Sequence, residues 1–184
     1  YSNLSMSAST LDGNEAAHGA GIYVASDQSV SIINSAIFGN SASVTGGGIY
    51  SYFDASISVH NTTVSGNSAQ YGGGLFANAN SSIGLNNSTV TGNSAAVSGG
   101  GVFSYGTGRV NITNSIVANS SGGGDCAVNM STVSSDSVSI LEDGSCSTDA
   151  RSIDPLLDVL ADNGGQTLTH ALLSGSPAID TGLI

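Results

Sequence analysis

The chain has 184 residues, which is enough for one domain with a continuous buried core. It carries 13 acidic residues against two arginines and no lysine, so its formal net charge is −11. A charge of that sign and size disfavours nucleic acids and anionic membrane surfaces as partners.

The first predicted elements are short strands in which apolar residues alternate with polar ones. Alternation is the period of a strand with one buried face, and no stretch of the first 120 residues has the 3.6-residue period of a helix. The alternating pairs recur along the chain at Leu4 and Met6, Val30 and Ile32, Ile57 and Val59, Ile83 and Leu85, and Val110 and Ile112.

Each repeat contains two further predicted strands. One lies around Ile37, Val64, Val90 and Val117. The other follows a glycine corner and pairs an aliphatic with an aromatic residue, at Ile22-Tyr23, Ile49-Tyr50, Leu75-Phe76 and Val102-Phe103. We expect these aromatic rings to stack along one side, and the corner to need positive φ or close backbone approach. Single-residue length changes fall just before the corner, so we expect a bulge there.

Asparagines recur with the same period. One column is Asn14, Asn40, Asn67, Asn93 and Asn119. A second column follows each alternating pair by two positions, and strand parity predicts that it points inward. An unsatisfied buried amide costs roughly 1–3 kcal/mol, so we expect structural hydrogen-bond ladders of Asn34, Asn61, Asn87, Asn114, Asn40, Asn67 and Asn93.

The alternating pairs, the glycine corners and the asparagines all repeat every 26 to 27 residues. This shared period predicts an all-β fold, a right-handed parallel β-helix. Three strands with their turns fill one coil, and successive coils stack about 4.8 Å apart. Residues 1–120 are predicted to form about five coils.

Residues 121–184 depart from the repeat and contain nine of the 13 acidic residues. An open sheet edge must be covered, so this segment is predicted to be a C-terminal cap within one continuous domain. Cys126 and Cys146 lie in it without a neighbouring Cys or His that would complete a zinc set. This favours a disulfide over two free thiols, and it fits export.

Several phrases of the chain resemble known families. The tail contains DPLL at 154–157, DNGG at 162–165, TLTH at 167–170 and SPAID at 176–180, and NSIV at 114–117 leads to DC at 125–126. These phrases resemble the C-terminal part of bacterial "choice-of-anchor Q" proteins. The glycine-aliphatic corners, with turns such as FGN at 38–40, resemble the repeats of polymorphic outer-membrane proteins. The resemblance covers the whole chain and implies secretion, often with a surface anchor, and no shared catalytic residues.

The two ends of the chain bear on its attachment to a cell. It starts at Tyr1 rather than Met and has no signal peptide, which indicates a processed or trimmed fragment. It ends at Ile184 without a sorting signal, a departure from the family pattern. No run of 18 apolar residues is present, so no membrane insertion is expected.

Catalysis has little support in the residues. A polysaccharide lyase needs a base near pH 7 and a cation, yet lysine is absent and Arg109 has no carboxylate at coil spacing. A hydrolase needs two carboxylates roughly 5–10 Å apart, and only Asp27 and Asp54 share a repeat column. That pair is expected to stabilise turns, to bind Ca²⁺ as a cofactor, or to form a carboxylate dyad.

The sequence therefore predicts a non-enzymatic, secreted or cell-surface bacterial protein with a structural or adhesive role. Its expected partners are other copies of itself, joined end to end into a filament, or glycans of the cell surface or matrix. The alternative is a carbohydrate-binding or polysaccharide-degrading β-helix.

Overall fold

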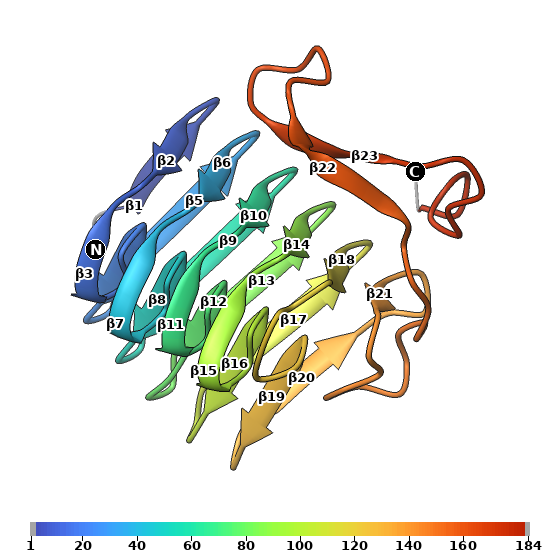
Figure 1. Ribbon diagram of the computed structural model, residues 1–184. Coiled ribbons are helices and arrows are strands. Elements are labelled where there is room, and N and C mark those ends of the chain that lie inside the picture. The colour runs from blue at the N-terminus through green and yellow to red at the C-terminus, as the bar shows by residue number, and fades with distance from the viewer. Residues whose placement is uncertain (1–2, 183–184) are drawn as a thin grey trace.

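The computed structural model describes residues 3–182, which form a stack of β-strand coils followed by a hairpin (Figure 1). The predictions on the chain ends concern Tyr1 and Ile184, which lie outside the described residues. Within residues 3–182, no helix has the length and apolar character needed to cross a membrane.

Four parallel sheets run along the stack, and each coil contributes one strand to each sheet in turn. Sheet A contains β1 (Asn3–Ser7), β5 (Ser29–Ile33), β9 (Ser56–His60), β13 (Ser82–Asn86), β17 (Arg109–Thr113) and β20 (Thr132–Ser135). Sheet B contains β2 (Thr10–Asp12), β6 (Ala36–Phe38), β10 (Thr63–Ser65), β14 (Thr89–Thr91), β18 (Ile116–Ala118) and β21 (Ile140–Leu141). Sheet C contains β3 (Glu15–His18), β7 (Ser41–Thr45), β11 (Ser68–Tyr71) and β15 (Ser94–Ser98). Sheet D contains β4 (Ile22–Ala25), β8 (Ile49–Tyr52), β12 (Leu75–Ala77), β16 (Val102–Tyr105) and β19 (Cys126–Asn129).

The prediction of three strands per coil is wrong, because sheet C supplies a fourth. Its strands lie between the column of Asn14, Asn40, Asn67 and Asn93 and the glycine corner, and they consist mainly of Ser and Ala. Small residues give no apolar alternation, so the strand period is invisible in the sequence. Backbone pairing with the neighbouring coils nevertheless holds these segments extended.

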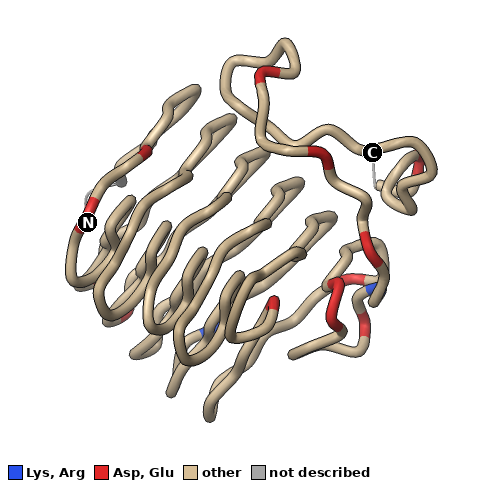
Figure 2. The backbone as a smooth tube through the Cα atoms, viewed as in Figure 1, with Lys and Arg blue, Asp and Glu red and all other residues tan. Residues whose placement is uncertain are grey.

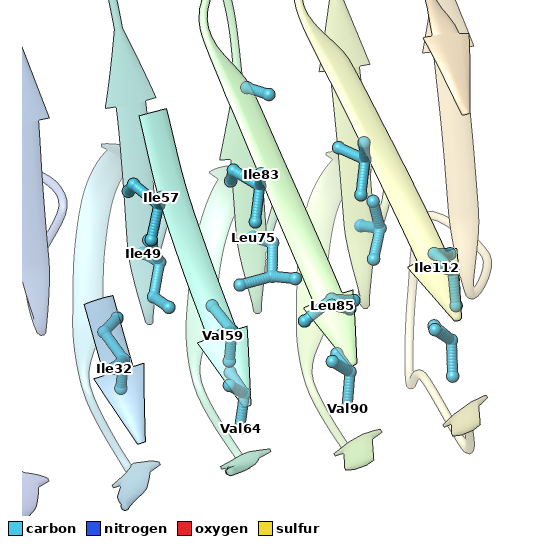
Figure 3. Packing of buried hydrophobic residues seen from close by; sticks show 14 of the residues in the cluster. Ile32, Ile49, Ile57, Val59, Val64, Leu75, Ile83, Leu85, Val90 and Ile112 are labelled. Carbon is cyan, nitrogen blue, oxygen red and sulfur yellow. The ribbon is translucent and has the colours of Figure 1, made fainter. Parts of the chain in front are cut away.

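The core is a column of aliphatic side chains inside the coils, drawn from sheets A, B and D (Figure 3). Equivalent residues stack in register, as Val30 pairs with Ile57 and Ile32 with Val59. Ile32, Val59 and Leu85 are fully buried. Burial of each such side chain stabilises the fold by about 1.5–3 kcal/mol, so the alternating pairs from Val30 to Ile112 contribute strongly to stability, whereas Leu4 in the first coil is 64% exposed.

The glycine corner between sheets C and D has both features expected of it. Gly46 has a φ of 63°, in the left-handed region. At Gly48 a Cβ would lie 2.7 Å from the carbonyl oxygen of Gly74 in the next coil, so only glycine allows the coils to approach this closely. The expected bulge is also present, because the register between β7 and β11 shifts before Tyr71.

The coils continue further than predicted. β19, β20 and β21 pair in parallel with β16, β17 and β18, so the solenoid extends to Leu141 rather than ending at residue 120. The repeat fades in the sequence because a glycine loop replaces the sheet C strand before β19, and because Ser135 of β20 stands in register with the core residue Ile112 of β17. Main-chain pairing needs no particular side chain, so it continues.

After Leu141 the chain first closes the end of the solenoid and then turns back. Arg151 forms a parallel bridge with Ile140, while Cys146 and Ala150 pack against the last layer of the core. An antiparallel hairpin follows, formed by β22 (Leu157–Ala161) and β23 (Thr169–Leu172). The hairpin lies beside the coils at the sheet B side rather than over the end (Figure 1). Only part of the predicted cap therefore covers the open edge.

Candidate functional site

Each sheet D strand of the first four coils contains an aliphatic residue followed by an aromatic one. The aliphatic side chain points into the core and the aromatic side chain points outward. Ile49 and Leu75 are fully buried in the aliphatic core, whereas Tyr50 and Phe76 belong to a second cluster outside it. The outward rings stack on one another as the sequence predicts. Their centroids are 5.2 Å apart for Tyr23 and Tyr50, 5.1 Å for Tyr50 and Phe76, and 5.2 Å for Phe76 and Phe103.

A second outward column lies two residues further along the same strands. It contains Tyr52, Asn78, Tyr105 and Asn129, which follow one another on successive coils. Tyr105 is 38% exposed and its ring meets that of Phe103 edge to face, with centroids 6.0 Å apart. Tyrosines and amides thus alternate along this side of the aromatic stack.

The opposite side is formed by the last residues of the sheet C strands, just before the glycine corner. Thr45 and Tyr71 lie next to each other in register. The Tyr71 ring stacks on Phe103 at a centroid distance of 5.9 Å. The corner thus brings outward side chains of two sheets together along the solenoid.

Between these columns lies an open groove of about 390 Å³, which we call the aromatic groove. No residue lining it is charged. Its lining consists of Val44, Thr45, Tyr50, Tyr71, Phe76, Asn78, Phe103, Tyr105 and Asn129.

Tyr50 is fixed in the floor of the groove. Burial raises the pKa of Tyr50 to about 12, and a hydrogen bond with the Asn78 side chain acts against this shift. The hydroxyl therefore stays protonated at neutral pH. The floor presents apolar ring surface and neutral hydrogen-bonding groups.

The sequence-based prediction for this side was limited to the stacked aromatic column and did not include Tyr52, Tyr71, Tyr105 or Asn78. A signal for two of them was available. In both Tyr50-Ser51-Tyr52 and Phe103-Ser104-Tyr105 a small residue separates two aromatics, and Ser51 and Ser104 are fully buried. That alternation indicates two aromatics on the outer face of one strand. Tyr71 had no such signal, because it lies between Gln70 and Gly72 and no second aromatic residue alternates with it.

The column of Asn40, Asn67 and Asn93 forms a buried ladder. Asn40 Nδ2 donates to Asn67 Oδ1 at 2.9 Å, and Asn67 Nδ2 donates to Asn93 Oδ1 at 3.0 Å. Each acceptor oxygen also receives the backbone N–H of the preceding coil's asparagine. Asn119 does not continue this column. It has a φ of 57° and occupies the position of Gly92 in the preceding coil. Ser120 therefore takes the register position after Asn93, where its buried Oγ does not continue the ladder.

The second predicted ladder is wrong in orientation. Asn34, Asn61 and Asn87 are exposed and Asn114 is half-buried, with amide contacts at the surface between Asn61 and Asn34 and between Asn114 and Asn87. Their φ angles, 51°, 45°, 49° and 47°, are left-handed. Parity holds only within an extended strand, so one left-handed residue turns the side chain outward.

The next residue in each coil points inward instead and forms a hydroxyl ladder. Thr62 Oγ1 accepts the N–H of Ser35 at 3.3 Å, and Ser88 Oγ accepts that of Thr62 at 3.2 Å. Each hydroxyl donates to a carbonyl two residues earlier, as Thr62 does to His60 at 2.8 Å. Polar groups at this corner are therefore satisfied within the stack.

Asp27 and Asp54 lie on adjacent coils in the turn between sheets D and A, away from the aromatic groove. Both are exposed and left-handed, with φ of 60° and 59°, a conformation that Asp and Asn tolerate in turns. Their backbone N–H groups bond to Phe53 and Ala79 of the next coil. Within residues 3–182, no three His, Cys, Asp or Glu side chains are grouped so as to hold a metal ion. Calcium binding by the pair stays a prediction.

Cys126 and Cys146 form the predicted disulfide, which links β19 to the segment that closes the solenoid. Beside it, Asp143 accepts the N–H of Asp125 at 2.8 Å, and Asp125 accepts that of Asp143 at 3.1 Å. Burial raises the pKa of Asp125. Burial also acts to raise the pKa of Asp143, but hydrogen bonds from Ser145 and from backbone N–H groups, including that of Asp125, together outweigh it and lower that pKa. The disulfide and this pair anchor the closing segment to the last coil.

Comparison with known proteins identifies the fold family. A sequence model described as the right-handed β-helix region matches residues 3–140, which covers the coils from β1 to the first residue of β21. Neither the curated proteins nor the solved structures give a match. With four parallel sheets wound around one aliphatic core over the same residues, the chain belongs to the right-handed β-helix family.

Proposed function

We propose that the chain is a non-enzymatic adhesive module of a secreted or cell-surface bacterial protein, and that it recognises a glycan-bearing surface or matrix through the aromatic groove. The observation that carries this proposal is the groove itself. Its sides carry the exposed ring of Tyr105 and the half-buried ring of Tyr71, and accessible aromatic rings beside amide and hydroxyl groups are typical of surfaces that bind a ligand. A solenoid core is already complete without them, since the aliphatic cluster excludes them.

Extracellular placement has three supports. A disulfide between Cys126 and Cys146 is typical of oxidising compartments. The acidic, lysine-free composition suits an extracellular setting. The tail phrases at 154–157 and 176–180 resemble choice-of-anchor Q proteins, and that resemblance adds a cell-surface location in a bacterium.

Binding is favoured over hydrolysis by the groove's chemistry. A glycosidase needs two carboxylates placed on either side of the scissile bond. The groove lining contains neither a carboxylate nor a histidine. Asp27 and Asp54 lie in the turns that follow β4 and β8 and are not part of the lining. A polysaccharide-degrading activity thus has no site in the groove from which to act.

The test is adhesion to insoluble polysaccharide and bacterial cell-wall preparations, measured by depletion of the protein from solution, with a reducing-end assay on the same samples. We expect the wild-type protein to bind at least one preparation without releasing sugar, and the double variant Tyr71→Ala, Tyr105→Ala to bind at least tenfold less. Failure of the wild-type protein to bind any preparation would refute adhesion. Release of reducing ends would refute the non-enzymatic assignment.

A further inference from the structure

We infer that the aromatic groove holds a neutral, extended polysaccharide chain that lies along the solenoid axis, with about one sugar unit per coil. This inference rests on the proposed function, since it names the ligand class of the same groove. Four properties of the groove lead to it: its length, the exposure of its rings, its hydrogen-bonding groups and its charge.

The groove is elongated along the stack. Its lining comes from four successive coils, represented by Tyr50, Phe76, Phe103 and Asn129. Strands of neighbouring coils lie about 4.8 Å apart, so the groove extends over roughly 14 Å. One coil rise is close to the length of one pyranose unit in an extended β-1,4-linked chain. A repeating surface of this kind fits a polymer with the same repeat better than it fits a single small molecule.

The rings of the groove have different roles. Tyr50 and Phe76 stack on neighbours in both directions, so the faces of these floor rings are already occupied and their edges are available to a ligand. Tyr105 and Tyr71 stand at the two sides, and Tyr105 is 38% exposed. The side rings therefore provide the apolar surface on which the CH face of a sugar packs.

The polar groups match those of a sugar. Asn78 and Asn129 carry amides, which both donate and accept hydrogen bonds, whereas the Thr45 hydroxyl is already bonded to His18 Nδ1 at 2.7 Å. Sugar hydroxyls, like amides, both donate and accept. Amides and tyrosines alternate along the sheet D side, so a chain with one unit per coil meets stacking and hydrogen-bonding groups in turn.

The charge of the groove and of the whole protein favours a neutral polysaccharide as the ligand. The groove lining is uncharged, while the protein as a whole carries −11. An acidic polysaccharide is therefore repelled by the overall field and gains no cationic partner in the groove. A cationic polymer is attracted first to the segment after β21, where acidic residues gather (Figure 2). The electrostatics of the groove fit a ligand without formal charge.

The test is calorimetric titration with β-1,4-linked oligosaccharides of glucose, mannose and N-acetylglucosamine, each from two to six units. For at least one sugar we expect affinity to increase with length up to about four units and then to level off. Tyr71→Ala and Tyr105→Ala should each weaken binding about threefold to tenfold, the range expected for loss of one aromatic contact. Phe53→Ala is the matched control, because Phe53 is 53% exposed, lies outside the groove, and has its ring contact with Tyr52, which does not line the groove either. Circular dichroism confirms that each variant is folded.

Three results would overturn the inference: affinity that does not depend on chain length, tighter binding of oligogalacturonate or of a chitosan oligosaccharide than of any neutral oligosaccharide, or an equal loss in Phe53→Ala. The first two would leave adhesion through the groove intact if the insoluble preparations are still bound. Cleavage of a bound neutral oligosaccharide would support the inference while refuting the non-enzymatic assignment.

Discussion

Asn67 is at the centre of the buried amide ladder and has a partner on each side. Its Oδ1 accepts two hydrogen bonds from Asn40, and its Nδ2 donates to Asn93 and to the Ile37 carbonyl oxygen. Because the side chain is 1% exposed, water does not replace these bonds when the amide is removed. Stability at this position therefore comes from complete pairing of polar groups inside the stack.

We predict that Asn67→Ala lowers the free energy of unfolding by about 2–4 kcal/mol, because the amide of Asn40 and the Oδ1 of Asn93 lose buried partners. Urea unfolding measures the change. The control is Asn61→Gly, which removes an exposed amide at a left-handed position while keeping a residue that tolerates it. We expect it to cost less than about 1 kcal/mol. Equal losses in the two variants would contradict the ladder's role.

Tyr50 makes the fold sensitive to alkaline pH. Its pKa is about 12 in the folded state against an ordinary value of 10.0, so between these values the folded state holds a proton that the unfolded state has lost. Stability is therefore full below pH 10 and falls as pH rises from 10 to 12. We predict that Tyr50→Phe flattens this part of the profile, measured by urea unfolding at several pH values. An unchanged slope between pH 10 and 12 would contradict the assignment to Tyr50.

Single residues also show where sequence reasoning succeeds and where it stops. Ile32 and Val59 were predicted to point inward because they lie within extended strands, where alternation is a geometric necessity. Asn34 was misplaced because its left-handed backbone ends the alternation, and no residue type marks that change reliably. Tyr71 could not be placed in a groove, since the groove exists only where two sheets meet across the glycine corner.

At the scale of elements, the segment after Leu141 depends on a few strong connections. Its disulfide joins Cys146 to β19, and the carboxylates of Asp125 and Asp143 accept each other's backbone N–H groups. The hairpin of β22 and β23 contacts the coils through His170, whose Nε2 lies 2.9 Å from Ser65 Oγ. An isolated two-stranded hairpin is only marginally stable, so the disulfide-linked part holds this region in place.

We predict that the double variant Cys126→Ser, Cys146→Ser lowers the free energy of unfolding by about 3 kcal/mol, as expected for a closed loop of about 20 residues. Hydrogen exchange locates the effect. Amides of β19 and of the segment from Glu142 to Arg151 should lose protection, while those of β9 and β13 keep theirs. Uniform loss of protection across all coils would contradict this local role.

The strands that contain regularly spaced aliphatic residues were predicted from the sequence, and those without them were missed. Sheets A, B and D follow from Val, Ile and Leu at regular positions. Sheet C and the last coil were missed because pairing between main chains carries them, and main-chain pairing leaves little trace in a run of Ser, Ala and Gly. The hairpin's position beside sheet B depends on contacts such as His170 with Ser65, which are 105 residues apart.

At the scale of the whole molecule, the coils form a rigid column with an uncharged groove on the outside and acidic residues concentrated at one end (Figure 2). The sequence-based expectation of end-to-end association stays a prediction. If it is correct, size-exclusion chromatography at increasing protein concentration should show assemblies that grow without a defined size. A single monomer peak at all concentrations would contradict it.

The most direct test of recognition through the aromatic groove is a crystal structure of the protein grown with a neutral β-1,4-linked hexasaccharide. We predict an intact sugar chain along the groove, parallel to the solenoid axis, with sugar rings packed on Tyr71 and Tyr105 and hydroxyls bonded to Asn78 and Asn129. A saccharide bound elsewhere on the molecule, or crystals with an empty groove at saturating saccharide, would contradict this account.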